Sequence, residues 1–111
     1  MSFGSVLAAI MLALVSSQTY DMECIWCMNV VTNAQTAFGQ RIANVSNVQF
    51  LLYFRRECRL DERKSPVYAG VCFYMLQTHP LILFNDLRHN ATALETCNDC
   101  GFCIPNLTAV L

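Results

Sequence analysis

Five of the seven cysteines lie in two short clusters whose spacing allows three kinds of chemistry. Cys24 and Cys27 form a CxxC unit near the start of the chain, and Cys97, Cys100 and Cys103 follow one another at three-residue steps near its end. Separated CxxC units are typical of zinc ribbons, and a single CxxC unit is typical of a redox site. Cysteines in small secreted proteins also anchor structural disulfides. The local spacing alone leaves all three open.

The N-terminal segment separates these alternatives because it indicates the compartment. Residues 3–15 are apolar and uncharged, and the small residues Ser16 and Ser17 follow them. This pattern is typical of a secretory signal peptide, and the run is shorter than the ~20 residues of a membrane span. We therefore predict a signal peptide over residues 1–17 and a protein that is secreted or enters the lumen of a lysosome-like or secretory compartment.

An oxidising compartment makes a disulfide framework the expected role of the cysteines. Oxidation removes the thiolates that zinc requires, so we predict no metal. A thioredoxin-like redox role is not expected either, because no βαβ pattern surrounds either CxxC unit. No cofactor is predicted.

Residues 18–111 suit one domain, because no Gly/Ser/Pro-rich linker or repeat divides them.

Seven Lys and Arg nearly balance eight Asp and Glu, so there is no global field to attract nucleic acid. Ser46 and Ser65 stand outside nucleophile-elbow contexts, and Asp86 with His89 has the i,i+3 spacing of a surface helix contact. We predict neither an enzyme nor a nucleic-acid-binding protein.

Hydrophobic periodicity predicts about five short amphipathic helices and no strands, which is an all-α bundle. Between residues 23 and 40, apolar side chains recur at three- and four-residue steps, and Cys24 and Cys27 lie on that core-facing stripe. Ser46 or Asn47 is a suitable N-cap for a second helix.

Prolines and a glycine mark the boundaries of the remaining helices. Pro66 and Pro80 suit the first turns of a third and a fourth helix. A fifth is expected to begin near Thr92 and to end at Gly101, which suits a left-handed C′ position. The runs VQFLLYF, VCFYML and LILF are apolar nearly all round, which is more than one small core absorbs. We therefore expect a lipid-accessible surface or a subunit interface.

The cysteine spacing and the helix order together resemble the saposin-like (saposin B-type) family. That family has a CxxC unit in its first helix, a central pair of cysteines flanking a helix–helix loop, and two cysteines six residues apart near the C-terminus. A sequon before the second helix agrees with the family pattern, as does a proline with an aliphatic run after the fourth cysteine. The corresponding residues here are Cys24, Cys27, Cys58, Cys72, Cys97, Cys103, Asn44 and Pro80.

The resemblance implies three nested bridges, Cys24–Cys103, Cys27–Cys97 and Cys58–Cys72. Helical spacing alone would place Cys100 one turn from Cys97 on the same face, but a helix that ends at Gly101 lets Cys103 swing back. Cys100 is then the odd cysteine, either a buried small hydrophobe, which we favour, or an intermolecular bridge.

The resemblance also implies lipid or membrane binding. Seven apolar residues are expected to face lipid: Val31, Phe38, Leu51, Phe54, Val71, Met75 and Leu83. Each of them has plain core packing as the alternative. The basic cluster between Arg55 and Lys64 is a candidate for lipid head groups, with a solvated helix end as its alternative. His79, at the expected bend between the third and fourth helices, is a pH-switch candidate, with no role as its alternative.

We accordingly expect a secreted saposin-like protein that binds lipids or membranes, with permeabilisation of target membranes in defence or digestion as the specific form. One alternative is a non-enzymatic lipid-transfer or activator protein that presents lipid to a hydrolase. Another is a disulfide-stapled protein-recognition domain. A homodimer or higher oligomer is a further expectation, and three sequons, Asn44, Asn90 and Asn106, are candidate glycosylation sites.

Overall fold

The structure, a computed structural model, describes residues 21–103, and within this range it contains helices and no strand. In chain order the elements are α2 (Met22–Phe38), the 3-10 helix η1 (Gly39–Asn44), α3 (Asn47–Lys64), α4 (Pro66–Thr78), α5 (Pro80–Arg88) and α6 (Ala93–Asp99). The prediction of an all-α bundle is confirmed. The predicted signal peptide, residues 1–17, and the sequon at Asn106 lie outside the described residues.

Side-chain caps explain where the helices begin. The Asp21 carboxylate accepts a hydrogen bond from the Cys24 N–H at 3.0 Å, at the start of α2. Ser46 and Gln49 form a reciprocal capping box at the start of α3, with bonds of 3.2 and 2.9 Å. The Ser65 hydroxyl accepts from the Tyr68 N–H at 3.3 Å at the start of α4, and the Thr92 hydroxyl accepts from the Glu95 N–H at 3.1 Å at the start of α6. These oxygens satisfy amides that a first helical turn leaves unpaired.

A glycine ends α2 earlier than the periodicity predicts. We expected the apolar stripe to reach Gln40 and Gly39 to weaken the helix, and the helix ends at Phe38 because Gly39 has φ 59°, a left-handed conformation. The chain then tightens into η1, which the sequence did not predict. This 3-10 segment, with about three residues per turn, leads the chain to the start of α3.

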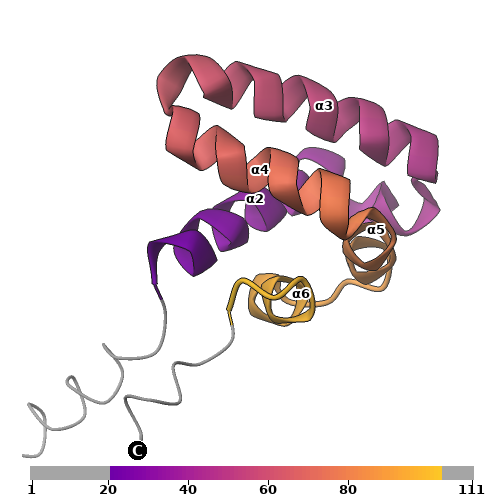
Figure 1. Ribbon diagram of the computed structural model, residues 1–111. Coiled ribbons are helices and arrows are strands. Elements are labelled where there is room, and N and C mark those ends of the chain that lie inside the picture. The colour runs from indigo at the N-terminus through magenta and orange to yellow at the C-terminus, as the bar shows by residue number, and fades with distance from the viewer. Residues whose placement is uncertain (1–20, 104–111) are drawn as a thin grey trace, which may run out of the picture.

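α3 and α4 form a helical hairpin, and α2 and α6 form a second pair (Figure 1). α3 and α4 lie side by side, and α2 packs against both α4 and α6. The chain bends by 92° between α4 and α5, at His79, so that α5 turns away from the hairpin. No single helix among residues 21–103 is long and apolar enough to cross a membrane, although α4 and α5 together meet that length and composition across their bend.

Three disulfides hold this arrangement together. Cys24–Cys103 and Cys27–Cys97 join α2 to α6 and the turn after it, and Cys58–Cys72 joins α3 to α4. Their Cα–Cα distances are 4.7, 5.9 and 5.4 Å, within the usual range for a bridge. These are the pairings that the resemblance implied. Of the three kinds of chemistry that the spacing left open, the structure selects structural disulfides.

The C-terminal turn shows why Cys103, and not Cys100, forms the outer bridge. Gly101 has φ 85°, which ends α6 and reverses the chain. The amides of Phe102 and Cys103 then donate to the Cys97 carbonyl at 2.9 and 3.3 Å. Cys100 is buried and unpaired, as predicted for the odd cysteine. The left-handed glycine predicted at this position therefore does bring Cys103 back to α2.

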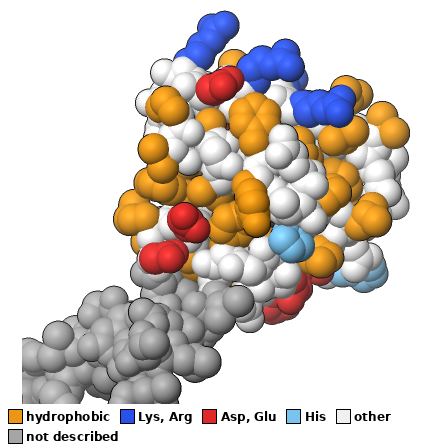
Figure 2. Space-filling model, viewed as in Figure 1, with side chains coloured by type: hydrophobic (Ala, Val, Ile, Leu, Met, Phe, Trp, Pro, Cys, Tyr) orange, Lys and Arg blue, Asp and Glu red, His pale blue; other side chains and the backbone are white. Residues whose placement is uncertain are grey.

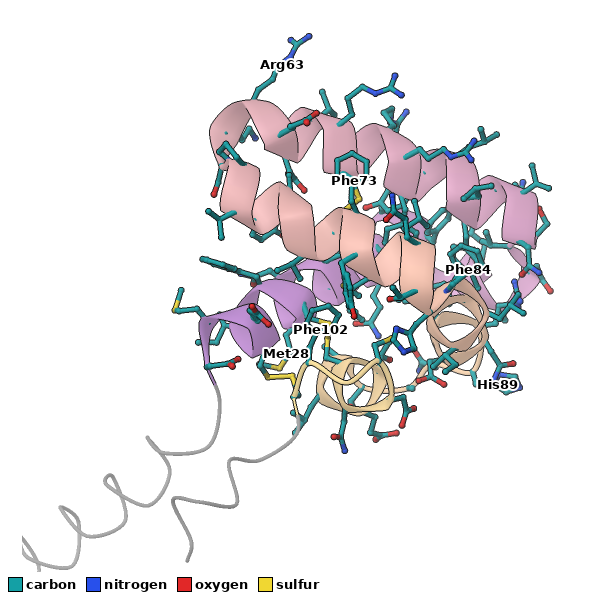
Figure 3. The ribbon with its side chains drawn as sticks, viewed as in Figure 1. Met28, Arg63, Phe73, Phe84, His89 and Phe102 are labelled. Atoms are coloured by element: carbon teal, nitrogen blue, oxygen red, sulfur yellow. A yellow bond between two sulfur atoms is a disulfide. The ribbon has the colours of Figure 1, made fainter. Side chains whose placement is uncertain are left out.

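Stacked aromatic rings form the centre of the core between α3 and α5. The ring of Phe84 lies 5.3 Å from that of Phe50 and 6.1 Å from that of Phe54, centroid to centroid. Figure 3 shows Phe84 pointing from α5 towards α3. Offset aromatic pairs of this kind add about 0.5–1.5 kcal/mol each beyond the burial of their surface.

Most of the residues expected to face lipid are part of this core. Five are buried, and Phe38 and Leu51 are half-buried. The five buried ones are Val31, Phe54, Val71, Met75 and Leu83. In this conformation they form no surface open to solvent, because the stripes of neighbouring helices meet one another. Core packing, the alternative weighed for each of them, is what the structure shows.

Candidate functional site

The outward side of α3 carries both basic and apolar side chains. Helical spacing brings them onto one side of the helix, away from its buried residues Phe50, Phe54 and Cys58. Val48, Leu52 and Leu60 are 64%, 61% and 47% exposed, so this side of α3 combines apolar and basic side chains. We call this set of residues the basic face: Val48, Leu52, Arg55, Arg56, Arg59, Leu60 and Arg63.

The acidic residues of α3 mostly lie on its other side. Glu57 and Asp61 are half-buried and border the same small depression as Tyr53 and Tyr68. Burial, with the charge of Glu57, raises the pKa of Asp61. Burial and the charge of Glu57 also raise the pKa of Tyr53 to about 12, so this phenol keeps its proton at physiological pH. Glu62 is the exposed acid nearest the basic face.

The arginines of the basic face are largely free of ion pairs. Within residues 21–103 the structure contains one ion pair, between Arg56 and Glu57 at 3.6 Å, and it is solvent-exposed. Exposed pairs of this kind hold the side chains weakly. Figure 3 shows Arg63 pointing away from the bundle at the end of α3. The guanidinium groups are therefore available to an anionic surface.

Arg88 has a structural role instead. Its guanidinium donates to the Val45 carbonyl at 3.0 Å and to the Asn47 side chain at 2.6 Å. It also lies over the Phe50 ring, 5.5 Å from the centroid. These contacts fasten α5 to the junction of η1 and α3, so Arg88 is not part of the basic face.

Charge is therefore separated along the molecule although the net charge is only −1. Figure 2 shows most of the visible Lys and Arg side chains at the edge formed by α3, with one acidic side chain among them. The opposite end carries acids at the start of α2 and on α5 and α6. They are Asp21, Glu23, Asp86, Glu95 and Asp99. The balanced totals of the sequence conceal this separation, because they add both ends together.

A groove borders the basic face where α2, η1 and α3 meet. It has a volume of about 640 Å³ and contains no acidic side chain. We call it the α2–α3 groove, and six of its lining residues carry the argument below: Phe38, Arg41, Asn44, Leu52, Tyr53 and Arg56. Arg56 and Leu52 are shared with the basic face, whereas Arg41 on η1 is not.

A second groove lies at the other end of the molecule, between α2, α4 and the C-terminal turn. It has a volume of about 590 Å³ and an aromatic lining that includes Trp26, Tyr74 and Phe102, but its charged residues include the acids Glu23 and Asp99. The Cys100 thiol also borders it. Burial and the charges of Asp86 and Asp99 raise the pKa of this thiol to about 11, which keeps it protonated and unreactive.

The pH-switch candidate His79 lies at the sharpest bend of the chain. It is half-buried between α4 and α5, and its Nδ1 lies 2.7 Å from the Thr78 hydroxyl. It borders the second groove rather than the basic face. Its role in pH response stays a prediction.

Two of the three sequons fall within the described residues, and both asparagines are exposed. Asn90 follows α5 with φ 58°, a left-handed conformation that asparagine tolerates. Asn44 ends η1 and borders the α2–α3 groove. A glycan on Asn44 would therefore begin at the edge of that groove.

Sequence reasoning found the arginines but missed how they combine with apolar residues. Arg59 and Arg63 follow Leu52 by seven and eleven residues, a spacing that places them on one side of a helix. That signal could have identified the basic face. Arg41 was missed because η1 was not predicted. No group of three or more His, Cys, Asp or Glu side chains among residues 21–103 is placed to hold a metal ion.

Comparison with family models, with curated proteins and with solved structures found no match to this chain.

Proposed function

We propose that this chain is a secreted saposin-like protein that binds anionic lipid membranes through the basic face of α3. The observation that carries the proposal is the alternation of exposed Val and Leu with four arginines on one side of one helix. Helices of this composition lie in the membrane interface, where apolar side chains enter the acyl boundary and cations contact head groups. The three nested bridges support the family part of the proposal.

Among residues 21–103, Arg56 is the one arginine of the basic face with an ion pair, and this scarcity of pairs supports a lipid surface over a solvated helix end. A solvated end would be expected to carry i,i+4 ion pairs, whereas Glu57 and Asp61 lie on the half-buried side of α3. The fold also holds α3 rigidly, through its capping box and the Cys58–Cys72 bridge. A preordered helix loses little conformational entropy on binding.

Vesicle binding tests this proposal directly. The protein is titrated with vesicles of phosphatidylglycerol and phosphatidylcholine, and with phosphatidylcholine vesicles alone. We expect binding to the anionic vesicles that weakens as salt rises. The double variant Arg59→Gln/Arg63→Gln should bind roughly thirtyfold more weakly, because each basic side chain near such a surface contributes about 1 kcal/mol.

Two single variants serve as controls. Glu62→Gln removes an acid beside the basic face and should strengthen binding. Arg41→Gln removes an arginine that lies off this face and should weaken vesicle binding much less than the double variant does. Equal binding by the wild type and the double variant would contradict the proposal.

The same vesicles distinguish the forms of the function. Leakage of an enclosed dye would support permeabilisation, and extraction of lipid into solution without leakage would support a transfer or activator protein. No binding to any vesicle would leave the recognition-domain alternative.

A further inference from the structure

We infer that the α2–α3 groove binds a single anionic amphiphile, with its phosphate or carboxylate between Arg41 and Arg56 and the start of its acyl chain against the apolar wall. This inference rests on the proposed function for the class of ligand, but it names a separate site. The basic face would contact a membrane surface as a whole, whereas the groove would hold one molecule.

The charges of the groove select an anion. Arg41 comes from η1 and Arg56 from α3, so cations border the groove from two different elements. The lining includes no Asp or Glu, and the rest of its polar residues, Asn44 and Gln49, are neutral. Arg56 contacts one acid, Glu57, through an exposed pair that an incoming anion can replace. Guanidinium groups bind phosphate and carboxylate with paired hydrogen bonds.

The apolar wall selects an amphiphile over a free inorganic ion. Phe38, Leu52 and Tyr53 line the groove together with the small side chains of Ala37 and Val45. The volume of about 640 Å³ falls within the ~300–1,000 Å³ usual for small-molecule sites. A phosphate ion would occupy a small part of this space and leave the wall in water. An acyl chain covers it.

The groove is formed before any ligand arrives. The Phe38 ring packs at 5.2 Å against Phe50 and at 5.0 Å against Tyr53, centroid to centroid. Arg88 fixes the backbone of Val45 beside it, at 3.0 Å. Because these contacts tie the wall to the aromatic core, binding would require little rearrangement.

The second groove does not suit the same ligand. Its volume and aromatic lining are comparable, but it contains Glu23 and Asp99. An anionic head group there would face like charges without a paired arginine. The two grooves therefore differ in the sign of the ligand that they favour, and the α2–α3 groove is the one that fits an anionic amphiphile.

Titration with dodecyl phosphate below its micelle concentration tests the inference. The full secreted chain is used, with its three bridges and without glycans, and binding is followed by calorimetry and by amide NMR shifts. We expect one molecule per chain and shifts centred on residues 38–56. Arg41→Gln should weaken binding about five- to tenfold, and Arg41→Lys should weaken it less. Inorganic phosphate and dodecyl maltoside should each bind far more weakly.

The Arg59→Gln/Arg63→Gln variant separates this inference from the proposed function. It should weaken vesicle binding and keep dodecyl phosphate binding, because both residues lie outside the groove. Arg41→Gln should weaken dodecyl phosphate binding and should affect vesicle binding much less than the double variant does. Dodecyl phosphate binding without any vesicle binding would overturn the proposed function alone. An unchanged affinity in Arg41→Gln, or shifts centred on the second groove, would overturn the site. If inorganic phosphate bound as tightly as dodecyl phosphate, the assignment of an amphiphile as the ligand would be wrong.

Discussion

Asp86 on α5 faces the acidic side chains of α6 across the contact between these two helices. Among residues 21–103, its Oδ2 atom is buried and has no hydrogen-bond partner. Burial, a side-chain hydrogen bond with Asp99 and the charges of Asp99 and Glu95 raise the pKa of Asp86 from 3.8 to about 6, against a smaller lowering by His89. A proton on this carboxyl would give the buried oxygen a hydrogen bond to Asp99.

The raised pKa predicts that this contact stabilises the fold in acid. The folded state binds the proton more tightly than the unfolded state, so the stability from this group is fully present below about pH 4 and is lost as the pH rises through about 6. Asp86→Asn supplies a permanent amide donor to Asp99. Between pH 4.5 and 7.5, the melting temperature of Asp86→Asn should therefore change less than that of the wild type. The two changes should differ by a few degrees.

The melting temperatures of both proteins are measured across this pH range by circular dichroism. The difference between them isolates Asp86 from the histidines, which both proteins keep. Asp99→Asn should flatten the pH profile in the same way, and Glu95→Gln should do so less. Parallel profiles for the wild type and Asp86→Asn would contradict the assignment.

At the scale of helices, two glycines of similar exposure should respond oppositely to substitution. Gly70 lies inside α4, and a Cβ added there would meet no atom within 4 Å. Gly101 also has open space, but its φ of 85° is one that L-residues rarely adopt. Open space alone therefore does not decide the outcome, because backbone conformation differs between the two positions.

Gly70→Ala should raise the free energy of unfolding by about 0.5–1 kcal/mol, because alanine is the better helix former. Gly101→Ala should lower it by about 1 kcal/mol or more, because the turn that returns Cys103 to α2 would be strained. Urea unfolding of the oxidised proteins measures both. A destabilised Gly70→Ala would show that α4 needs the glycine for another reason.

The starts of helices could be predicted from the sequence because their causes are local. Ser46, Pro66 and Pro80 mark these boundaries through caps and fixed dihedral angles, and no distant contact is needed. The aromatic core could not be assigned in the same way. Periodicity left both core packing and a lipid-facing role open for Phe54, because which apolar stripes meet depends on the 92° bend between α4 and α5. The structure places Phe54 in the core, and a lipid-facing role for these residues stays a prediction.

The candidate site was only partly predictable for a related reason. The arginines of α3 are adjacent in sequence and were recognised as a cluster. Helical spacing alone separates them from Glu57 and Asp61, but which of these two sides is exposed depends on how α3 packs against α4. The α2–α3 groove depends on η1, which follows from the left-handed Gly39. A groove built from three elements has no signature within any one of them.

At the scale of the whole molecule, the two nested bridges close almost the same loop. Cys24–Cys103 spans 79 residues and Cys27–Cys97 spans 70, whereas Cys58–Cys72 spans 14. Once one nested bridge has formed, the other closes only the short ring between them. In the chain-entropy model a lone bridge over the long loop stabilises by about 4.5 kcal/mol, and the second adds about 2–3 kcal/mol.

Removing these bridges should therefore be strongly non-additive. Cys27→Ala with Cys97→Ala should cost about 2–3 kcal/mol, and so should Cys24→Ala with Cys103→Ala, because the other bridge still closes the long loop. Removing both should cost about 7 kcal/mol. Urea unfolding gives these values. The two variants that each lack one bridge test the nested account even if the variant that lacks both bridges does not fold. A single-bridge cost of 4 kcal/mol or more would contradict the nested account.

The corner between α3 and α4 gives the bridges another consequence. Arg63 and Lys64 are exposed there, so the peptide bond after Lys64 is open to a protease that cleaves after basic residues. All three disulfides join a residue before that bond to a residue after it. A single cut would yield two polypeptides that stay one molecule until the disulfides are reduced. Continuity of the backbone at this corner is thus not what keeps the two parts of the fold attached.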